Sequence, residues 1–139
     1  MSTTKQRPFL EAQWERAARH TDGRIFAWGN EFDASLCNMN ETGIGGTSAV
    51  GIFPGGAAEC GAMDMCGNVL EWCRTVYCDN YKDYQKKVSD DLEGTTARVV
   101  RGGAFYLNRD YVRSAYRSTN LVPNLRLEYY GFRVVAPGL

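Results

Sequence analysis

The chain has 139 residues, of which 44% are hydrophobic and 23% charged, proportions that are typical of one globular domain with a single core. Its 16 basic and 16 acidic residues cancel, so the net charge favours neither nucleic acid nor an anionic membrane surface as a partner. No apolar run is long enough to span a membrane, and the polar start MSTTKQRP does not resemble a signal peptide. We therefore expect no membrane insertion, and a protein that stays in the cytoplasm or is carried to a virion or cell surface by a partner.

A helix is expected first, over residues 8–20. One face of this helix is apolar, with residues at i, i+4, i+7 and i+8: Leu10, Trp14, Ala17 and Ala18. Pro8 stands near the start of the segment, where proline is tolerated, and Gly23 lies just beyond its end, where helices commonly stop.

The rest of the chain predicts loops and strands. Residues 26–61 are rich in Gly, Asn, Ser and Thr, which indicates a long ordered loop. Residues 79–97 are polar and charged, which indicates an exposed excursion. Residues 98–105, 111–117 and 129–135 are β-branched and aromatic, which predicts strands. The pattern indicates an α+β domain with little helix, a small twisted antiparallel sheet and many long loops.

The cysteines are odd in number and irregularly spaced: Cys37, Cys60, Cys66, Cys73 and Cys78. No CxxC motif occurs, and the one histidine, His20, is far from them in sequence, so a zinc site is not expected. The pattern favours reduced, mostly buried thiols over a disulfide framework.

Residues 64–72, with the sequence DMCGNVLEW, form the densest local motif. Asp64 and Glu71 flank a Gly-Asn turn, so two carboxylates and the turn carbonyls could converge on a calcium ion, which prefers oxygen ligands. In the alternative interpretation, Asp64 and Asn68 cap turns, while the apolar residues beside them pack inward.

Five of the eight tyrosines fall within residues 105–130, interleaved with Asn, Arg and Ser and without lysine. Binding surfaces use this mixture because Tyr gives a large contact for few lost rotamers, Asn and Ser give adaptable hydrogen bonds, and Arg gives planar donors. In the alternative interpretation, these tyrosines are core and cross-strand packing of a sheet.

The motif DMCGNVLEW is similar to the DMxGNVxEW signature of the formylglycine-generating-enzyme (sulfatase-modifying factor) domain, a variant of the C-type lectin fold. Further segments match this family in the same order: EAQWERAAR at 11–19, FAWGN at 26–30, ETGIGGTSAVGIFP at 41–54, RVVRGG at 98–103, RSAYR at 113–117 and GFRVV at 131–135. The resemblance implies one C-type lectin-like domain over residues 1–139, trimmed at its amino terminus.

The resemblance also implies a structural calcium ion at the signature turn. Its ligands would be the side chains of Asp64 and Glu71 and the carbonyls of Gly67 and Val69. A second calcium site of some members corresponds to Asn38, Thr42 and the carbonyls of Met39 and Ile44. Thr42 stands where the family has a carboxylate, which weakens the case for the second site.

The enzymatic function of the family lacks its ligands here. Formylglycine-generating enzymes bind copper through a cysteine pair after the RGG motif, and residues 104–133 contain no cysteine. Where the pair belongs, this chain has Leu107, Asn108, Tyr111 and Val112. The related sulfoxide synthases need a histidine-ligated iron, which one histidine cannot supply. We therefore expect neither copper nor iron, and no catalysis.

A third branch of the family, the variable proteins of diversity-generating retroelements, fits better. These proteins keep RGG-type and GFR-type anchors and diversify the residues between them at adenine-containing codons. By this resemblance the variable region is 105–130, with these ligand-contacting residues: Phe105, Tyr106, Leu107, Asn108, Asp110, Tyr111, Tyr116, Ser118, Thr119, Asn120, Leu121, Val122, Asn124, Leu125, Leu127 and Tyr129.

The resemblance thus implies a receptor-type binding protein with a protein ligand, such as a receptor on a host or neighbouring cell, and an oligomer would raise its affinity by multivalency. A residual oxidase and a structural or assembly domain stay open as alternatives.

Overall fold

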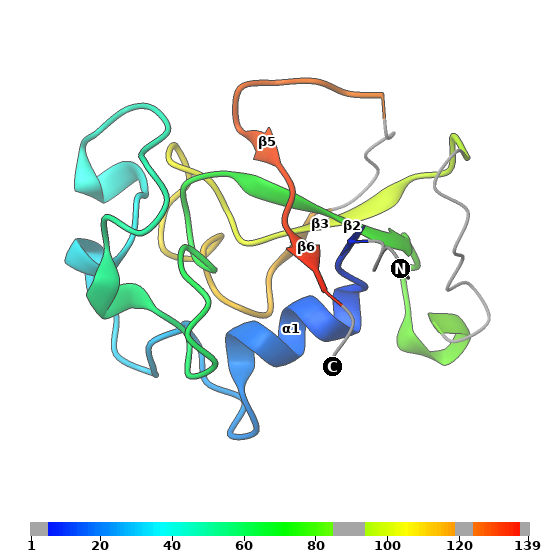
Figure 1. Cartoon of the computed structure of the whole chain (residues 1–139), viewed down its shortest axis with the longest axis horizontal. Coiled ribbons are helices and arrows are strands. Elements are labelled where there is room, and N and C mark those ends of the chain that lie inside the picture. The colour runs from blue at the N-terminus through cyan, green and yellow to red at the C-terminus, as the bar shows by residue number, and fades with distance from the viewer. Residues whose placement is uncertain (1–5, 85–93, 119–123, 137–139) are drawn as a thin grey trace, which may run out of the picture.

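The computed structural model describes residues 6–84, 94–118 and 124–136. Its longer elements and strands in chain order are β1 (Arg7–Pro8), α1 (Glu11–Arg19), β2 (Leu70–Val76), β3 (Arg98–Arg101), β4 (Arg117–Ser118), β5 (Tyr130–Gly131) and β6 (Val134–Val135). Short 3-10 turns are η1 (Ala34–Leu36), η2 (Asn40–Thr42), η3 (Pro54–Gly56) and η4 (Tyr81–Asp83). Helix α1 lies along one side of the sheet, and the long loops gather at one end of the molecule (Figure 1).

The central sheet has the strand order β4-β3-β2-β5. β2 and β3 pair antiparallel, with Trp72 opposite Val100. β5 pairs parallel to β2, with Leu70 opposite Tyr130, so the prediction of an antiparallel sheet is wrong at this edge. A parallel pair needs a long connection, and the chain between β2 and β5 supplies one. β1 and β6 form a separate two-stranded ribbon.

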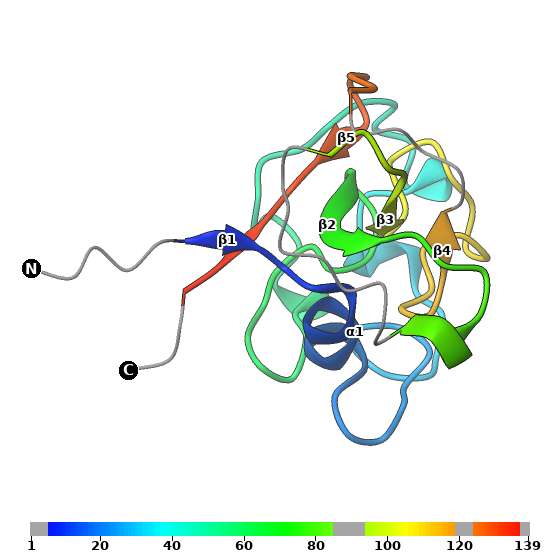
Figure 2. The same ribbon diagram turned by 90° about the vertical axis from the view of Figure 1, so that its right-hand side faces the viewer.

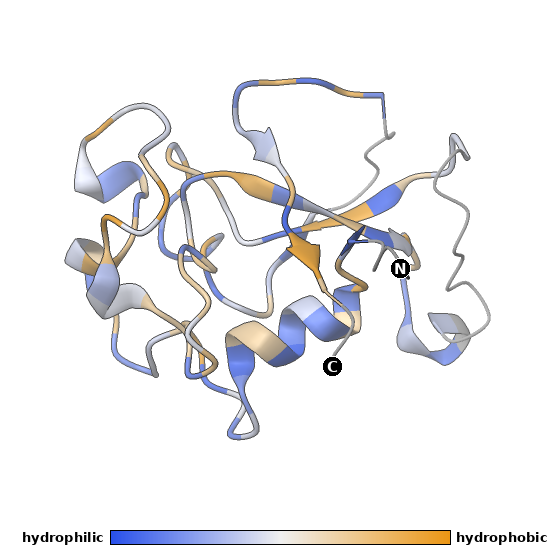
Figure 3. Ribbon diagram, viewed as in Figure 1, coloured by the Kyte–Doolittle hydropathy of each residue, from blue (hydrophilic) through white to orange (hydrophobic). Residues whose placement is uncertain are grey.

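Helix α1 is shorter than the predicted 8–20. Pro8 pairs within β1 and Leu10 has extended backbone (φ −66°, ψ 148°), so the helix begins at Glu11. Trp14 and Ala18 are fully buried, which confirms the apolar face. Glu11 is buried beside them although it is charged, because arginines of the sheet neutralise it. Hydrophilic and hydrophobic residues alternate along the helix in Figure 3.

Strand β2 was not predicted, because Glu71 and Arg74 interrupt its apolar pattern. Inside the fold its residues alternate between buried and half-buried positions, and Glu71 is neutralised by Arg133. The charge of Glu71, which made this segment look unlike a buried strand, is therefore compensated by Arg133, a residue far along the chain.

The predicted strand 111–117 is mostly turns. Tyr111 N–H donates to the Asn108 carbonyl and Tyr116 N–H to the Arg113 carbonyl, which leaves the two residues of β4 to pair with β3. The chain leaves the sheet after Arg101, the last residue of β3, because Gly102 follows with a φ of +97° that favours glycine. The predicted strand 129–135 divides into β5 and β6, between which the Arg133 side chain turns inward.

The long loop predicted over 26–61 is confirmed, since its described regular structure is limited to one-turn helices and an isolated bridge. Buried side chains such as Phe26, Cys37 and Met39 pin it to the main core around Trp14. Residues 79–82 are exposed as predicted, and residues 85–93 of the predicted excursion lie outside the described residues. No helix in the described part of the chain is long and apolar enough to cross a membrane.

The prediction of reduced, mostly buried thiols is confirmed. All five cysteines are free, and four are buried, the exception being Cys60. Burial raises the pKa of Cys66 to about 11 and that of Cys37 to about 12, so these thiols stay protonated and inert at neutral pH.

Candidate functional site: a tyrosine-rich surface on a fixed frame

The predicted contact residues lie on the segment after β3 and on the chain that leads into β5 (Figure 1). Six of them are exposed: Tyr106, Asn108, Asp110, Tyr111, Asn124 and Leu127. Five are half-buried: Leu107, Tyr116, Ser118, Leu125 and Tyr129. Four lie outside the described residues: Thr119, Asn120, Leu121 and Val122.

The side chain of Phe105 does not reach this surface, because it is only 8% exposed. Its backbone N–H donates to the Asn68 carbonyl at 2.9 Å, which holds the residue against the signature turn and directs its ring inward. The ring lies edge-on to Tyr106, with centroids 5.7 Å apart. Phe105 therefore supports the surface and is not a contact residue, which corrects the prediction.

Residues between the exposed positions anchor the segment. Val112 and Ser114 are fully buried, directly beside exposed Tyr111 and Arg113. The segment is also tied to the long loop, because the Leu107 carbonyl accepts from Asn40 N–H at 3.0 Å. The Ser114 N–H donates to the Ile25 carbonyl at 2.8 Å, which ties the segment to the residue just before that loop. Alternating burial and these backbone bonds make the segment a fixed frame with outward side chains.

Five tyrosines form what we call the tyrosine surface: Tyr106, Tyr111, Tyr116, Tyr129 and Tyr130. The rings of Tyr106 and Tyr129 lie 4.7 Å apart, those of Tyr129 and Tyr130 4.9 Å, and those of Tyr111 and Tyr116 5.1 Å. Burial, reinforced by Tyr129, raises the pKa of Tyr106 and Tyr130, so these hydroxyls are uncharged hydrogen-bonding groups at neutral pH.

Part of the tyrosine surface is also packing. Tyr116, Tyr129 and Tyr130 lie against a small buried cluster of Leu70, Val100 and Ala104, as the alternative interpretation expects. Tyr106 and Tyr111, at 44% and 41% exposed, are not accounted for by packing. Large apolar rings held at the surface by others beneath them are the anchors that binding sites use.

Ion pairs missed by the sequence analysis hold this frame to α1. The guanidinium of Arg117 binds both carboxylate oxygens of Glu11 and donates to the Cys78 carbonyl at 3.0 Å. Arg101, which is fully buried, pairs with Glu15 and donates to the carbonyls of Ala115 and Tyr116. Sequence reasoning could have found these arginines because both lie in the segments that match the family, RVVRGG and RSAYR.

The signature turn is built around an internal cation. Arg133 donates to both carboxylate oxygens of Glu71, at 2.7 and 2.6 Å, and also to the carbonyls of Met63 and Asp64. Trp14 Nε1–H donates to the same carboxylate at 2.7 Å. Burial alone would lower the pKa of Arg133, but the hydrogen bonds and charge of Glu71 hold it above its ordinary value. The guanidinium therefore stays charged and neutralises Glu71.

The second carboxylate of the signature turn is also engaged. The Asp64 carboxylate accepts from Gly51 N–H at 2.7 Å. Gly67 has φ +82°, and a Cβ there would come within 2.2 Å of the Asn38 carbonyl oxygen. In the part of the chain that the structure describes, no group of three His, Cys, Asp or Glu side chains is placed to hold a metal. Both side chains that were expected to bind calcium here, those of Asp64 and Glu71, are thus hydrogen-bonded within the protein.

The second expected calcium site is similarly short of charge. Asn38 is buried, and its Nδ2 donates to Gly46, Ser48 and Asn68, while its Oδ1 accepts no hydrogen bond from the described residues. Thr42 Oγ1 lies 2.7 Å from the Cys37 carbonyl and accepts from Met39 N–H, and Ile44 is exposed. Calcium takes six to eight oxygen ligands with carboxylates among them, and this set supplies no carboxylate.

We expect calcium to leave the thermal stability unchanged. Because Arg133 already supplies the positive charge at Glu71, an added ion would have to displace an ion pair before binding. The melting temperature in excess calcium should equal that in a chelator to within one degree or so, since a ligand stabilises only by binding the native state. A melting temperature that rises with calcium, and no longer rises in Asp64→Ala, would contradict this and restore the calcium site.

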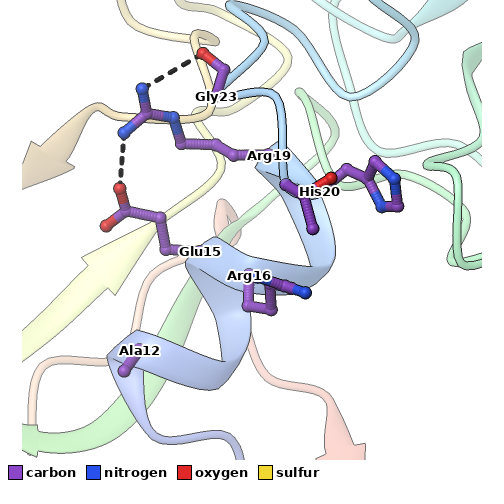
Figure 4. Close-up of a pocket in the computed structure, with 7 residues that line it drawn as sticks. Ala12, Glu15, Arg16, Arg19, His20 and Gly23 are labelled. Atoms are coloured by element: carbon purple, nitrogen blue, oxygen red, sulfur yellow. Dashed lines mark hydrogen bonds and ion pairs between the residues drawn. The ribbon is translucent and has the colours of Figure 1, made fainter.

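A hollow at the carboxyl end of α1 lies apart from the predicted contact residues (Figure 4). Its lining residues are Ala12, Glu15, Arg16, Arg19, His20, Thr21 and Gly23. Arg19 bridges Glu15 and the Gly23 carbonyl, so its charge is already satisfied. No metal-binding cluster is assembled there among the described residues.

The mixed sheet, single helix and long ordered loops define a C-type lectin-like fold of the formylglycine-generating-enzyme type. A family model for the sulfatase-modifying factor enzyme 1-like domain matches residues 7–137, and the chain belongs to this family. It is 32% identical to a formylglycine-generating enzyme of Thermomonospora curvata, with 93% of this chain and 48% of the relative covered.

Solved structures share the fold. Treponema denticola variable protein 1 superposes with a TM-score of 0.76 at 26% identity, covering 93% of this chain and 46% of its own. PvdO from Pseudomonas aeruginosa superposes with a TM-score of 0.77 at 29% identity, covering 94% and 52%. The chain therefore spans about half the length of these relatives, which include both an enzyme and a variable protein.

Proposed function

We propose that this chain is a non-catalytic, ligand-binding variable protein of a diversity-generating retroelement, whose diversified residues form the tyrosine surface and its surroundings. One observation carries the proposal. Described positions that the resemblance marks as variable are exposed or half-buried, except Phe105, whereas the intervening anchors Val112 and Ser114 are buried. A protein whose surface residues are diversified stays folded only if the variable positions are exposed and the anchoring positions between them are buried.

Two further observations support a protein ligand. The surface combines exposed Tyr106 and Tyr111 with the exposed amide of Asn108 and the side chains of Arg109 and Asp110, which are 65% and 71% exposed. Aromatic anchors with a polar surround are typical of protein–protein contacts. The structural similarity to Treponema denticola variable protein 1 supports the same class of function.

An oxidase is the weaker candidate. All five cysteines precede residue 79, and residues 104–133 offer no thiolate to copper. Four of the thiols are buried, which keeps copper from reaching them without unfolding. Copper titration with measurement of oxygen uptake tests this alternative; a bound metal together with turnover would overturn the non-catalytic proposal.

The genetic locus tests the proposed function directly. We expect a nearby reverse transcriptase gene and an imperfect copy of the codons for residues 105–130 that differs at adenines. Differences among related copies should fall at exposed positions such as Tyr106, Asn108 and Tyr111, and spare Val112 and Ser114. A locus without the reverse transcriptase would contradict the proposal. Differences spread evenly over the exposed and the buried positions would also contradict it.

Tyr111 and Val112 are neighbours in the chain, so they test whether an exposed position tolerates substitution better than a buried one. Tyr111→Ser should change the free energy of unfolding by less than about 1 kcal/mol, as exposed sites do. Val112→Ala should cost about 2 kcal/mol, because the site is fully buried and the change leaves a cavity. Equilibrium unfolding in urea measures both. Equal losses at the two sites would mean that Tyr111 is a structural residue.

The structural or assembly alternative makes a different prediction. Alanine at the exposed contact residues should leave any assembly unchanged if those residues bind a ligand. Loss of assembly in that variant, measured by size-exclusion chromatography with light scattering, would favour the structural role.

A further inference from the structure

An exposed guanidinium, that of Arg109, stands among the residues predicted to vary. Its neighbours Asn108, Asp110 and Tyr111 belong to the predicted contact residues, whereas Arg109 itself does not. Asp110 N–H donates to Asn108 Oδ1 at 3.0 Å, and Tyr111 N–H donates to the Asn108 carbonyl at 3.1 Å. Asn108 thereby closes a turn that has Arg109 near its tip. The turn projects a cation that is predicted to be constant from a surface that is predicted to change.

The side chain of Arg109 is held over an aromatic ring. Its guanidinium carbon lies 5.9 Å from the ring centroid of Phe32, which is 37% exposed. Phe32 packs in turn on the ring of buried Phe26, 5.8 Å away, and Phe26 stacks on Trp28 at 5.1 Å. Figure 2 shows the yellow segment after β3 beside the cyan part of the long loop, away from the two ends of the chain. The ring stack of the loop therefore orients a cation of the neighbouring segment.

The donors of this guanidinium have no hydrogen-bond acceptor in the part of the chain that the structure describes. Its acidic neighbour Asp110 lies 4.0 Å from Nε, beyond hydrogen-bond range, and both side chains are mostly exposed. Asp110 is also predicted to vary, so it is not a fixed partner. Arg101, Arg117 and Arg133, by contrast, each bind a carboxylate of their own chain. An arginine that is oriented but not hydrogen-bonded is suited to a carboxylate from another molecule.

We infer that Arg109, positioned by Phe32, binds the carboxylate of an Asp or Glu side chain on the protein ligand. The inference rests on the proposed function and adds to it the chemistry of one fixed contact. A guanidinium can donate two parallel hydrogen bonds to one carboxylate, which an ammonium group cannot do. Arginines and tyrosines are the residues that most often carry the binding energy of protein interfaces, and Tyr111 lies two residues away. The variable residues around Arg109 then select among ligands that share the acidic group.

The charges of the turn favour a carboxylate over a phosphate group. Phosphorylated ligands are usually recognised by clusters of arginines. Here Asp110 stands between Arg109 and Arg113, and Arg113 Nε donates to the Asp110 carbonyl at 2.8 Å within the turn. A single guanidinium with two parallel donors matches the two oxygens of one carboxylate.

Selection from a library of random peptides displayed on phage tests the inference with a defined probe. The library is selected in parallel on the whole chain and on Arg109→Gln, which should remain folded because the side chain is 65% exposed. We expect Asp and Glu to be enriched in the peptides that bind the unchanged chain and not in those that bind Arg109→Gln. The same acidic content in both sets of peptides would overturn the inference.

The affinities are measured by fluorescence anisotropy with the most enriched peptide, synthesised with an amidated carboxyl end so that its acidic groups are side chains. Arg109→Gln should raise the Kd at least about tenfold, because hydrogen bonds to a charged group are lost. Arg109→Lys should also raise it, since the charge remains while the planar pair of donors is lost. Arg16→Gln is the matched control, because Arg16 is exposed on α1 and lines the hollow apart from the contact residues. It should leave the Kd within about twofold, since distant exposed charges are screened.

Phe32→Leu tests the positioning role of the ring, because leucine keeps an apolar side chain over Phe26 but has no π face for the guanidinium. It should raise the Kd in the unchanged chain and have no further effect in the Arg109→Gln background. Equal effects in the two backgrounds would overturn the positioning role. Equal effects of Arg109→Gln and Arg16→Gln would show that the charge acts at long range, and would overturn the binding role.

The same peptides separate failure of this inference from failure of the proposed function. Peptides whose binding is weakened by Tyr111→Ser but not by Arg109→Gln would overturn this inference alone. If no selected peptide depends on the tyrosine surface, the result contradicts the proposed function and the inference with it. Near-UV circular dichroism verifies that each variant is folded.

Discussion

Replacing Glu11 with alanine should lower the free energy of unfolding by about 3–5 kcal/mol, the usual cost of removing one partner of a buried ion pair. Glu11 is 1% exposed and accepts from two nitrogens of Arg117, and Arg101 Nε lies 3.7 Å from it. Without this carboxylate, Arg101 still pairs with Glu15, whereas Arg117 loses both of its bonds to Glu11.

Urea unfolding of Glu11→Ala measures the loss. Glu59→Ala is the matched control, because Glu59 is 59% exposed and 3.6 Å from Arg24, and surface pairs contribute less than about 1 kcal/mol. A loss below about 1 kcal/mol for Glu11→Ala would show that water reaches the cluster. The change should also loosen the 113–118 frame, which hydrogen exchange of its amides would detect.

The second large effect is expected at the pair of Glu71 and Arg133. Each single alanine variant should lose about 3 kcal/mol, because each leaves a largely buried charge and, for Glu71→Ala, also an unpartnered Trp14 Nε1–H. The double variant should lose less than the sum of the two, with a coupling energy of about 1.5–3 kcal/mol. Additive losses in this double-mutant cycle would contradict the internal-cation role of Arg133.

The raised pKa of Arg133 fixes the sign of any pH effect. A group whose folded pKa lies above its unfolded value stabilises fully below the unfolded pKa, and that stability is lost only as the pH rises through the folded pKa. For an arginine that window lies far above neutrality. The Arg133 contribution should therefore be constant throughout the neutral range.

Some elements could be predicted because their signal is local. The face of α1 around Trp14 follows from a spacing of 3.6 residues per turn. The long loop over 26–61 follows from its composition, and the exposed positions from Tyr106 to Tyr111 follow from a mixture typical of binding surfaces. Each of these inferences uses only residues near one another in the sequence.

The sequence-based predictions failed for residues whose burial or charge compensation depends on a partner distant in the sequence. β2 was missed because Glu71 looks wrong for a buried strand until Arg133 neutralises it. The burial of Glu11 was not predicted, because it depends on Arg117, which is distant in the sequence. Phe105 looked like a contact residue until its backbone was seen bonded to Asn68.

The sequence by itself determined the family, the loop-rich α+β architecture and the tyrosine-rich segment, because motif spacing and composition are properties of the chain alone. The tertiary structure decided which of those side chains reach solvent, that Arg133 pairs with Glu71, and that Phe132 and Val134 face outward. Burial and charge compensation depend on residues brought together from distant positions, and only the folded chain brings them together.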